Sequence, residues 1–430
     1  MIKWSLILSL IIFSQPLWSA QLKPLYNYES PECPAEDALN HYIRVPLFYD
    51  LKSVARVENI PNLKFHDELR ARFAGRSISL YYEIHRHFDP QKETLFLIPG
   101  GPGEDHRILH RIDKLLEEKT GLLDHFNLVA MDHRGLGCSR PRFPGEEPSQ
   151  SLLMRYAASD IETIRRNLVG PEKKIHVLGF SYGTMLAQTY ALLYPGSVER
   201  LYLGAAFSSY RDFPEAQRKF EYIATSSIPG LFDRYLKVKE KDAVLSNAFL
   251  NWAVSPMYSY SGRVKEIPEK IAELEKLLDQ GNFESAYNAV KTETWVMPWM
   301  MRSIVCIEIF PWKKLADDEF QMFPVNFDTC REFEGQYEYF DYTENLRSLP
   351  MRTFIWGGAY DHVTTYEAMI KMAQRIPDNF FYLDPHLGHS TSGKGVCFAK
   401  MVEAFFNGKT DVQLREIAYS DACKRPPTVP

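Results

Sequence analysis

The sequence predicts an α/β fold, a mainly parallel β-sheet whose two halves are separated by a helical insertion. Short apolar runs typical of buried parallel strands recur along the chain, with helical or loop segments between them. They are Leu95–Ile98, Leu128–Met131, Ile175–Leu178, Leu201–Leu203, Thr353–Trp356 and Phe380–Leu383. Alternating apolar residues over Ile78–Ile84 predict one further strand ahead of them. Between about residues 209 and 349 the pattern favours helices, with no clear buried strand.

These changes of pattern set the predicted domain boundaries. Because the insertion separates two halves of one sheet, we expect it to form a mainly helical cap over the carboxyl edge of the strands, where open α/β sheets bind ligands. The expected units are a signal peptide (1–20), an N-terminal extension (21–75), the first part of the core (76–208), the cap (209–349) and the second part of the core (350–430).

The N-terminal segment predicts export. A single cation, Lys3, precedes an apolar run from Trp4 to Phe13, and small residues follow up to Ala20, which is typical of a cleaved signal peptide. The run is shorter than a membrane-spanning helix, and an uncleaved membrane anchor is the alternative. We therefore expect a periplasmic or extracellular protein without stable membrane insertion after cleavage.

The cysteines and the net charge narrow the possible partners. An even number of cysteines in an exported chain favours disulfides, and fifteen pairings are possible. The cysteines are Cys33, Cys138, Cys306, Cys330, Cys397 and Cys423. They contain no close C-x-x-C pair that would indicate zinc, and we expect neither a metal nor a cofactor. A formal net charge of −5 argues against a nucleic-acid partner. The oligomeric state stays open.

The strongest functional signal is the G-x-S-x-G sequence of residues Gly179 to Gly183. A predicted strand precedes it, and a helical pattern follows it and ends at a Pro-Gly pair. A nucleophile elbow requires this order of strand, tight turn and helix, because the serine sits in a strained turn with its hydroxyl exposed. The glycines remove side chains that would collide with the strand and the helix. Ser181 is therefore the predicted nucleophile, and an ordinary turn is the alternative.

A serine nucleophile needs a base and an acid that orients the base. Asp361 lies in a loop directly after a predicted strand, where the acid belongs, and an ordinary turn role is its alternative. Two histidines follow the last strand. We select His389, at the far end of that loop, as the base and expect His386 to be a structural loop residue. The chain order Ser, Asp, His is that of α/β-hydrolases.

The glycine-rich segment Pro99–Gly103 directly follows a predicted strand. Its glycines let main-chain N–H groups approach a substrate oxygen, so Gly101 and Tyr182 are the predicted oxyanion donors. A phosphate-binding loop is the alternative, but no Lys-Ser/Thr pair follows the glycines. After the next strand, we expect Arg134 to be a buried structural cation paired with Asp132 or a loop carbonyl.

Taken together, these motifs resemble the proline iminopeptidase and tripeptidyl aminopeptidase family of α/β-hydrolase serine exopeptidases. Five segments in family order carry the resemblance: Pro99–Gly103, Asp132–Ser139, Gly179–Gly183, Gly358–Asp361 and Gly388–His389. Members of the family often have His or Asn where this chain has Pro99, and Gln where it has His133. Both departures border the expected site, so the resemblance does not carry exact specificity to this chain.

The secreted, cysteine-bearing tripeptidyl aminopeptidases are the closer branch. The resemblance to them implies the disulfides Cys306–Cys330 and Cys397–Cys423, which leaves Cys33 and Cys138 for each other. In the resembling family an acidic residue of the cap near a cysteine pairs the α-ammonium of the substrate. By position Glu308 is the candidate, within an apolar, aromatic stretch that we expect to line the substrate site with Trp295 and Trp299. The alternatives for Glu308 are an ion pair with Arg302 or a solvated helix face.

The motifs and the resemblance together predict an exported serine aminopeptidase that hydrolyses short peptides from their N-termini through an acyl-enzyme. An esterase or another small-molecule hydrolase with the same triad is the first alternative, since it needs no acidic receptor in the cap. A catalytically inactive binding protein on the same fold is the second, and the intact nucleophile, acid and base argue against it. The number of residues released and any preference for proline stay open.

Overall fold

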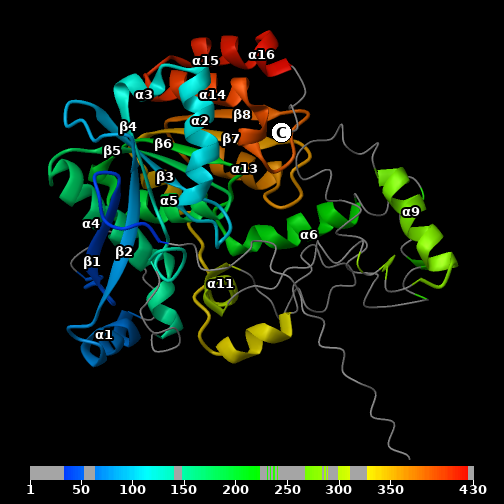
Figure 1. Ribbon diagram of the computed structural model, residues 1–430, viewed down its shortest axis with the longest axis horizontal. Coiled ribbons are helices and arrows are strands. Elements are labelled where there is room, and N and C mark those ends of the chain that lie inside the picture. Colours follow the sequence, from blue (N-terminus) through cyan, green and yellow to red (C-terminus); the bar gives the residue numbers. More distant parts are fainter. Residues whose placement is uncertain are drawn as a thin grey trace, which may run out of the picture.

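An eight-stranded sheet forms the centre of the computed structural model, which describes residues 33–52, 63–139, 148–222, 267–282, 299–309 and 327–424 with a few isolated positions between 230 and 288. The strand order is β1-β2-β4-β3-β5-β6-β7-β8 (Figure 1). The strands are β1 (Asn40–Pro46), β2 (Ser77–His85), β3 (Glu93–Ile98), β4 (Phe126–Met131), β5 (Ile175–Phe180), β6 (Val198–Gly204), β7 (Arg352–Gly358) and β8 (Asn379–Asp384). Strands β3 to β8 run parallel, and β2 is antiparallel to both of its neighbours.

Helices cover both faces of the sheet, which gives three layers (Figure 1). One face carries α4 (Met154–Val169), α5 (Tyr182–Leu193) and α13 (Tyr366–Ala373), and the other carries α2 (Leu109–Lys119), α3 (Leu122–His125), α14 (Val396–Phe406), α15 (Asp411–Ala418) and α16 (Asp421–Lys424). Alternate residues of β3 serve the two layers: Phe96 packs with α4 and α5, and Leu95 packs with α2 and α14. Because both faces are buried, the strands are continuous apolar runs in the sequence.

Every strand expected from the sequence is present, and the expected α/β fold with a helical insertion is confirmed. Strand β1 was not expected. It lies inside the segment assigned to the N-terminal extension, just ahead of helix α1 (Leu63–Arg72), and pairs with β2 along its whole length. As an edge strand it is only partly buried, so its sequence lacks the apolar pattern of the inner strands.

Between β6 and β7 the described part of the insertion is helical. It contains η4 (Tyr210–Asp212), α6 (Phe213–Tyr222), α9 (Ile267–Asp279), α11 (Trp299–Ile304), the π-helical turn η8 (Val305–Ile309), η9 (Phe327–Phe333) and η10 (Asn345–Ser348). In the view of Figure 1, α6 and α11 lie below the sheet and α9 lies at the right. A β-bridge between Ser209 and Asp341 joins the two ends of the insertion.

Three disulfides join segments that are distant in the chain, and they are the pairs that the family resemblance implies. Cys33–Cys138 ties the segment before β1 to the loop after β4, and Cys306–Cys330 ties the π-helical turn to η9. Cys397–Cys423 ties α14 to α16. The expected signal peptide (1–20) lies outside the described residues. Within the part of the chain that is described, no helix is long and apolar enough to cross a membrane.

Candidate active site

Ser181 occupies the tight turn between β5 and α5. Its backbone has φ 49° and ψ −121°, a left-handed conformation that is strained for a residue with a side chain. A Cβ atom at Gly179 would lie 2.6 Å from the carbonyl oxygen of Gly183. A Cβ atom at Gly183 would overlap the carbonyl oxygens of Ile98 and Pro99. Both motif glycines are therefore required by the close packing of β5, the turn and the end of β3.

The serine, the histidine and the aspartate expected from the sequence form one hydrogen-bonded series. His389 Nε2 lies 2.8 Å from Ser181 Oγ, and His389 Nδ1 lies 2.9 Å from Asp361 Oδ2. Asp361 also accepts hydrogen bonds from the Thr364 hydroxyl (2.6 Å) and from the N–H groups of Thr364 (2.8 Å) and Val363 (2.9 Å). An ionised aspartate holds the ring proton on Nδ1, so Nε2 is left to accept the serine proton.

Burial and hydrogen bonding act in opposite directions on Asp361. The side chain is fully buried, and burial alone would raise its pKa. The charge and hydrogen bond of His389, together with the donors of Thr364, outweigh burial and lower the pKa below its usual value. The carboxyl group is therefore ionised at neutral pH, as an orienting acid must be.

The loops after β7 and β8 pack against each other, which brings the acid and the base together. A Cβ atom at Gly358 would overlap the carbonyl oxygen of Leu387, and the Tyr360 N–H donates to that same oxygen at 3.0 Å. His386 is exposed, and its N–H donates to the carboxylate of Asp384 at 2.9 Å. Of the two histidines in this loop, His389 is the one that contacts the serine.

Unpaired main-chain donors lie beside the serine. The segment Pro99–Gly103 packs against the elbow, because a Cβ atom at Gly100 would lie 3.4 Å from that of Ser181. Gly101 has a φ of 108°, which favours glycine. Among the described residues, the N–H groups of Gly101 and Tyr182 have no hydrogen-bond acceptor. Two unpaired donors next to a nucleophile are what an oxyanion hole needs.

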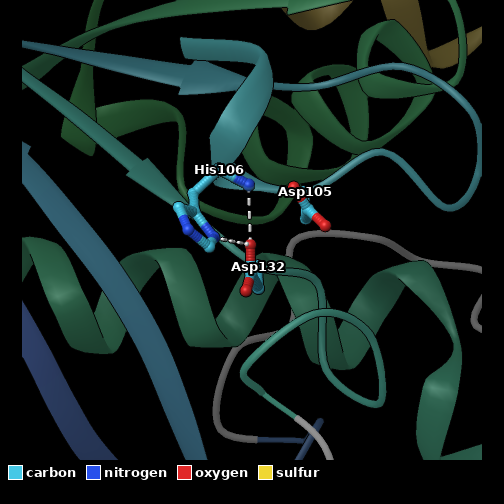
Figure 2. A group of neighbouring side chains, drawn as sticks. All are labelled: Asp105, His106 and Asp132. Carbon is cyan, nitrogen blue, oxygen red and sulfur yellow. Dashed lines mark hydrogen bonds and ion pairs between the residues drawn. The ribbon is translucent and has the colours of Figure 1, made fainter. Parts of the chain in front are cut away.

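A second buried aspartate–histidine pair follows the oxyanion segment in the chain (Figure 2). Asp132, just after β4, accepts hydrogen bonds from the N–H (2.7 Å) and Nδ1–H (2.8 Å) of His106 and from the N–H of Cys138 (2.6 Å). A Cβ atom at Gly137 would overlap the Asp132 carboxylate, so this loop wraps closely around it. We refer to Asp132 with its contacts to His106 and Cys138 as the Asp132 brace.

The same cluster contains the residue types of a metal site. Potential ligand atoms of Asp105, His106 and Asp132 lie within 4.8 Å of one another. The Asp105 carboxylate, however, already accepts from Arg107 Nε at 2.8 Å, and both Asp132 oxygens accept N–H groups. Burial acts to lower the pKa of His106, but Asp132 outweighs it and raises that pKa, which favours a protonated ring over a metal ligand. The cluster therefore holds the segment after the oxyanion donors against the loop after β4.

Arg134 is fully buried, but its carboxylate partner is Asp160 of α4 and not the expected Asp132. Arg134 Nε and Nη2 each lie 2.6 Å from an oxygen of Asp160. Its Nη1 donates to the carbonyl oxygens of Leu47 (2.8 Å) and Ser151 (2.9 Å). Of the two partners expected as alternatives for this buried cation, the loop carbonyl is present, and Asp132 is not a partner because the brace already occupies its carboxylate.

A cavity of about 730 Å³ lies between the cap and the core, and Glu308 of the π-helical turn lines it. Glu308 is 3% exposed, and both of its carboxylate oxygens accept the N–H of Met154, the first residue of α4, at 2.9 and 3.1 Å. Burial raises its pKa to about 8, although the charge of Arg155 and the Met154 N–H act in the opposite direction. A solvated helix face, one of the alternatives for this residue, is thereby excluded.

The other charged side chains around this cavity form four ion pairs. They are Arg155–Glu338 (2.5 Å), Arg211–Asp341 (3.0 Å), Lys371–Asp212 (3.5 Å) and Arg375–Glu344 (3.1 Å). Among the described residues Glu308 alone of this lining has no ion-pair partner. Arg302, its other expected partner, pairs with Glu332 at 3.3 Å. The cavity lining thus has one acidic side chain more than its basic side chains pair with.

Of the two tryptophans expected at the substrate site, one lies within the described residues. Trp295 lies outside the described residues, and Trp299 is the first residue of α11. Thr364, which donates two hydrogen bonds to Asp361, was not expected, although its position three residues after an aspartate in a loop is a local signal for such contacts. Met154 was not expected beside Glu308 either, and no sequence pattern connects them.

The chain belongs to the α/β hydrolase fold family, whose sequence profile matches residues 93–395. Within that family it is similar to proline iminopeptidases. The one from Pestalotiopsis fici is 25% identical over 270 residues, which cover 62% of this chain and 76% of the relative. The one from Lactobacillus crispatus is 24% identical over 303 residues, which cover 70% and 84%.

Solved structures agree on the fold. The crystal structure of the proline iminopeptidase of Mycobacterium smegmatis matches with a TM-score of 0.50 and 17% identity, covering 79% of this chain and 95% of that one. The sequence relatives from Pestalotiopsis fici and Lactobacillus crispatus confirm the expected resemblance to proline iminopeptidases.

Proposed function

We propose that the protein is an exported serine aminopeptidase that releases residues from the N-termini of short peptides. The observation that carries the proposal is the hydrogen-bonded series from Ser181 through His389 to Asp361, next to two unpaired main-chain donors. Sequence similarity supports a peptidase, because the similar proteins from Pestalotiopsis fici and Lactobacillus crispatus are proline iminopeptidases.

The proposed reaction is an acyl transfer to the serine followed by hydrolysis. Ser181 Oγ bonds to the scissile carbonyl carbon while its proton passes to His389 Nε2, and the N–H groups of Gly101 and Tyr182 receive the oxyanion. When the C–N bond breaks, His389 returns the proton to the leaving amine. Water then attacks the acyl-enzyme, its proton passes through His389 back to Ser181, and the released N-terminal fragment leaves as a carboxylic acid. Asp361 stays ionised and stabilises the imidazolium.

Glu308 is the proposed receptor for the α-ammonium of the substrate. Burial raises the pKa of Glu308 to about 8, so the free protein holds this side chain largely protonated at neutral pH, and an incoming ammonium group would favour its ionised form. The other charged groups of the cavity lining pair among themselves, so Glu308 is the acidic group of this lining that is left for a cationic ligand. The cavity has a volume of about 730 Å³, and Ser181, His389 and Asp361 are not among its lining residues, so the substrate must extend from the serine to this cavity for its ammonium group to reach Glu308.

Export is supported by two features. The N-terminal segment has the pattern of a signal peptide, and the described part of the chain has three disulfides and no free cysteine. N-terminal sequencing of the protein recovered from the periplasm or medium of the source cells would test export. Recovery in the cytoplasm with residues 1–20 intact would contradict it.

A matched panel of substrates tests the proposed activity. Aminoacyl-, dipeptidyl- and tripeptidyl-anilides are assayed with free and with acetylated N-termini, beside a simple acetate ester, and a fluorophosphonate probe reports the nucleophile. We expect the probe to label the wild-type protein and not Ser181→Ala. Among the anilides, we expect hydrolysis only of those with a free N-terminus. Hydrolysis of the ester without any anilide would support an esterase. Absence of both labelling and turnover would support a binding protein.

A further inference from the structure

His133 is a buried residue that the reaction does not use directly. It follows β4, is 4% exposed, and makes two polar contacts at opposite sides of its ring. Its Nδ1 lies 2.8 Å from the main-chain oxygen of Arg134, and its Nε2 lies 3.0 Å from the hydroxyl of Tyr182. Tyr182 immediately follows the predicted nucleophile and supplies one of the two oxyanion donors.

The direction of both hydrogen bonds follows from elementary chemistry. A carbonyl oxygen only accepts, so Nδ1 of His133 carries the ring proton and donates to Arg134. Burial lowers the pKa of His133 to about 4, so the ring is neutral at pH 7 and Nε2 bears a lone pair. The Tyr182 hydroxyl therefore donates to Nε2, and the phenol is held in one orientation.

This hydrogen bond lies beside the glycine-rich segment Pro99–Gly103. His133 and Tyr182 line one narrow space of about 10 Å³ together with Gly100 and Gly103. A space of that size is at most the size of a single water molecule, so the two side chains pack closely where the elbow meets the glycine segment. Shortening either side chain would enlarge this space and remove a contact beside the elbow.

We propose that His133 is a positioning residue that acts through Tyr182. Its ring accepts the Tyr182 hydroxyl proton, locks the buried phenol in place, and thereby aims the main-chain N–H of Tyr182 at the developing oxyanion. A donor displaced by a few tenths of an ångström stabilises the transition state less while ground-state binding of the substrate is unaffected. The inference rests on the proposed serine hydrolase chemistry but not on the peptide specificity.

The test compares His133→Leu, which removes the acceptor at similar volume, with His133→Gln, which keeps an amide oxygen as acceptor. Tyr182→Phe removes only the donor. All are assayed on the acetate ester and on the best anilide, well below the melting temperature of each variant. We expect His133→Leu and Tyr182→Phe each to lower kcat by roughly 10- to 100-fold with KM nearly unchanged, a part of the loss seen when an oxyanion donor is deleted.

Two further results separate positioning from general destabilisation. His133→Gln should recover most of the lost kcat, and the double variant His133→Leu, Tyr182→Phe should lose no more than the worse single variant, because both remove the same hydrogen bond. Unchanged kcat in His133→Leu would overturn the inference, as would a loss that His133→Gln does not recover.

The ester separates this inference from the proposed aminopeptidase activity. If wild-type protein cleaves the ester but no anilide, the peptide specificity fails, and the effect of His133→Leu on ester turnover still decides the role of His133. If wild-type protein cleaves anilides and the His133 variants match it, the positioning role fails alone. If wild-type protein cleaves nothing, both fall, since there is no oxyanion for Tyr182 to receive.

Discussion

Two buried aspartate–histidine pairs of this molecule have nearly the same geometry and different surroundings. The Nδ1–oxygen distance is 2.9 Å for His389 and Asp361 and 2.8 Å for His106 and Asp132. In each pair the aspartate lies shortly after a parallel strand and accepts additional N–H groups. A contact between an imidazole and a buried carboxylate is therefore not by itself the signature of a catalytic site.

The difference lies on the far side of each ring. Nε2 of His389 faces the Ser181 hydroxyl at 2.8 Å, whereas the ring of His106 packs on that of Tyr81 with 4.5 Å between centroids. The strained elbow at Ser181 is what exposes a hydroxyl to the first pair. Proton transfer to a nucleophile can thus be expected of the first pair and mechanical support of the second.

The largest expected effect is the loss of turnover when Ser181 or either member of the first pair is replaced. Ser181→Ala, His389→Ala and Asp361→Asn should each lower kcat on the order of 10⁴- to 10⁶-fold, with little change in the free energy of unfolding. Double variants should be hardly worse than the worst single one, because the three side chains act as a unit. Steady-state kinetics of purified variants would measure this. Substantial turnover in His389→Ala together with its loss in His386→Ala would show that the wrong histidine was selected.

The Asp132 brace should respond in the opposite way. Asp132→Ala removes the acceptor of three hydrogen bonds and should lower the free energy of unfolding by about 3–5 kcal/mol, the usual cost of breaking a buried ionic pair. Asp132→Asn keeps one oxygen and should cost less. Urea denaturation would measure the loss, and kcat of the protein that remains folded should stay within about tenfold of wild type. Abolished turnover at unchanged stability would place the brace in the chemistry.

A third buried acidic side chain sharpens the comparison, because Glu308 has neither a histidine contact nor an ion-pair partner among the described residues. Glu308→Gln should weaken kcat/KM on anilides with a free N-terminus by about 1.5–3 kcal/mol, the scale of a hydrogen bond to a charged group. Turnover of the acetate ester should barely change. Glu344→Gln, at the rim of the same cavity, is the matched control. Equal losses on both substrates would reject the recognition role and assign Glu308 to the scaffold.

The raised pKa of Glu308 also predicts a pH dependence of stability. Its folded-state pKa of about 8 lies above the ordinary value of 4.5, so between these pH values the folded protein holds a proton that the unfolded chain has lost. The free energy of unfolding should therefore fall as pH rises through this window. Because Glu308→Gln does not titrate, its stability relative to wild type should improve from pH 5 to pH 8.5. Parallel denaturation curves across this range would contradict the raised pKa.

Much of the candidate site could be predicted because its signals are local. The elbow is a strand, a turn and a helix within the 19 residues from Ile175 to Leu193, and its two glycines are needed for steric reasons that the structure bears out at Gly179 and Gly183. The prediction of His389 over His386 also depended on local position in the loop. In the structure His389, at the far end of that loop, contacts the serine. Strand β1 escaped prediction because an edge strand that is half exposed has no apolar pattern.

By itself the sequence determined the order of strands and helices, the predicted nucleophile and the loops that carry the acid and the base. Apolar periodicity and glycine sterics act over a few residues and are written in the chain. Only the tertiary structure decided the partners: Ser181 and His389 are 208 residues apart, and Glu308 and Met154 are 154 apart. Such contacts depend on how the sheet places its loops and on where the cap lies. For that reason Asp132 contacts His106 and not Arg134. Short-range sterics specify a motif, but burial of the whole chain selects which motifs meet.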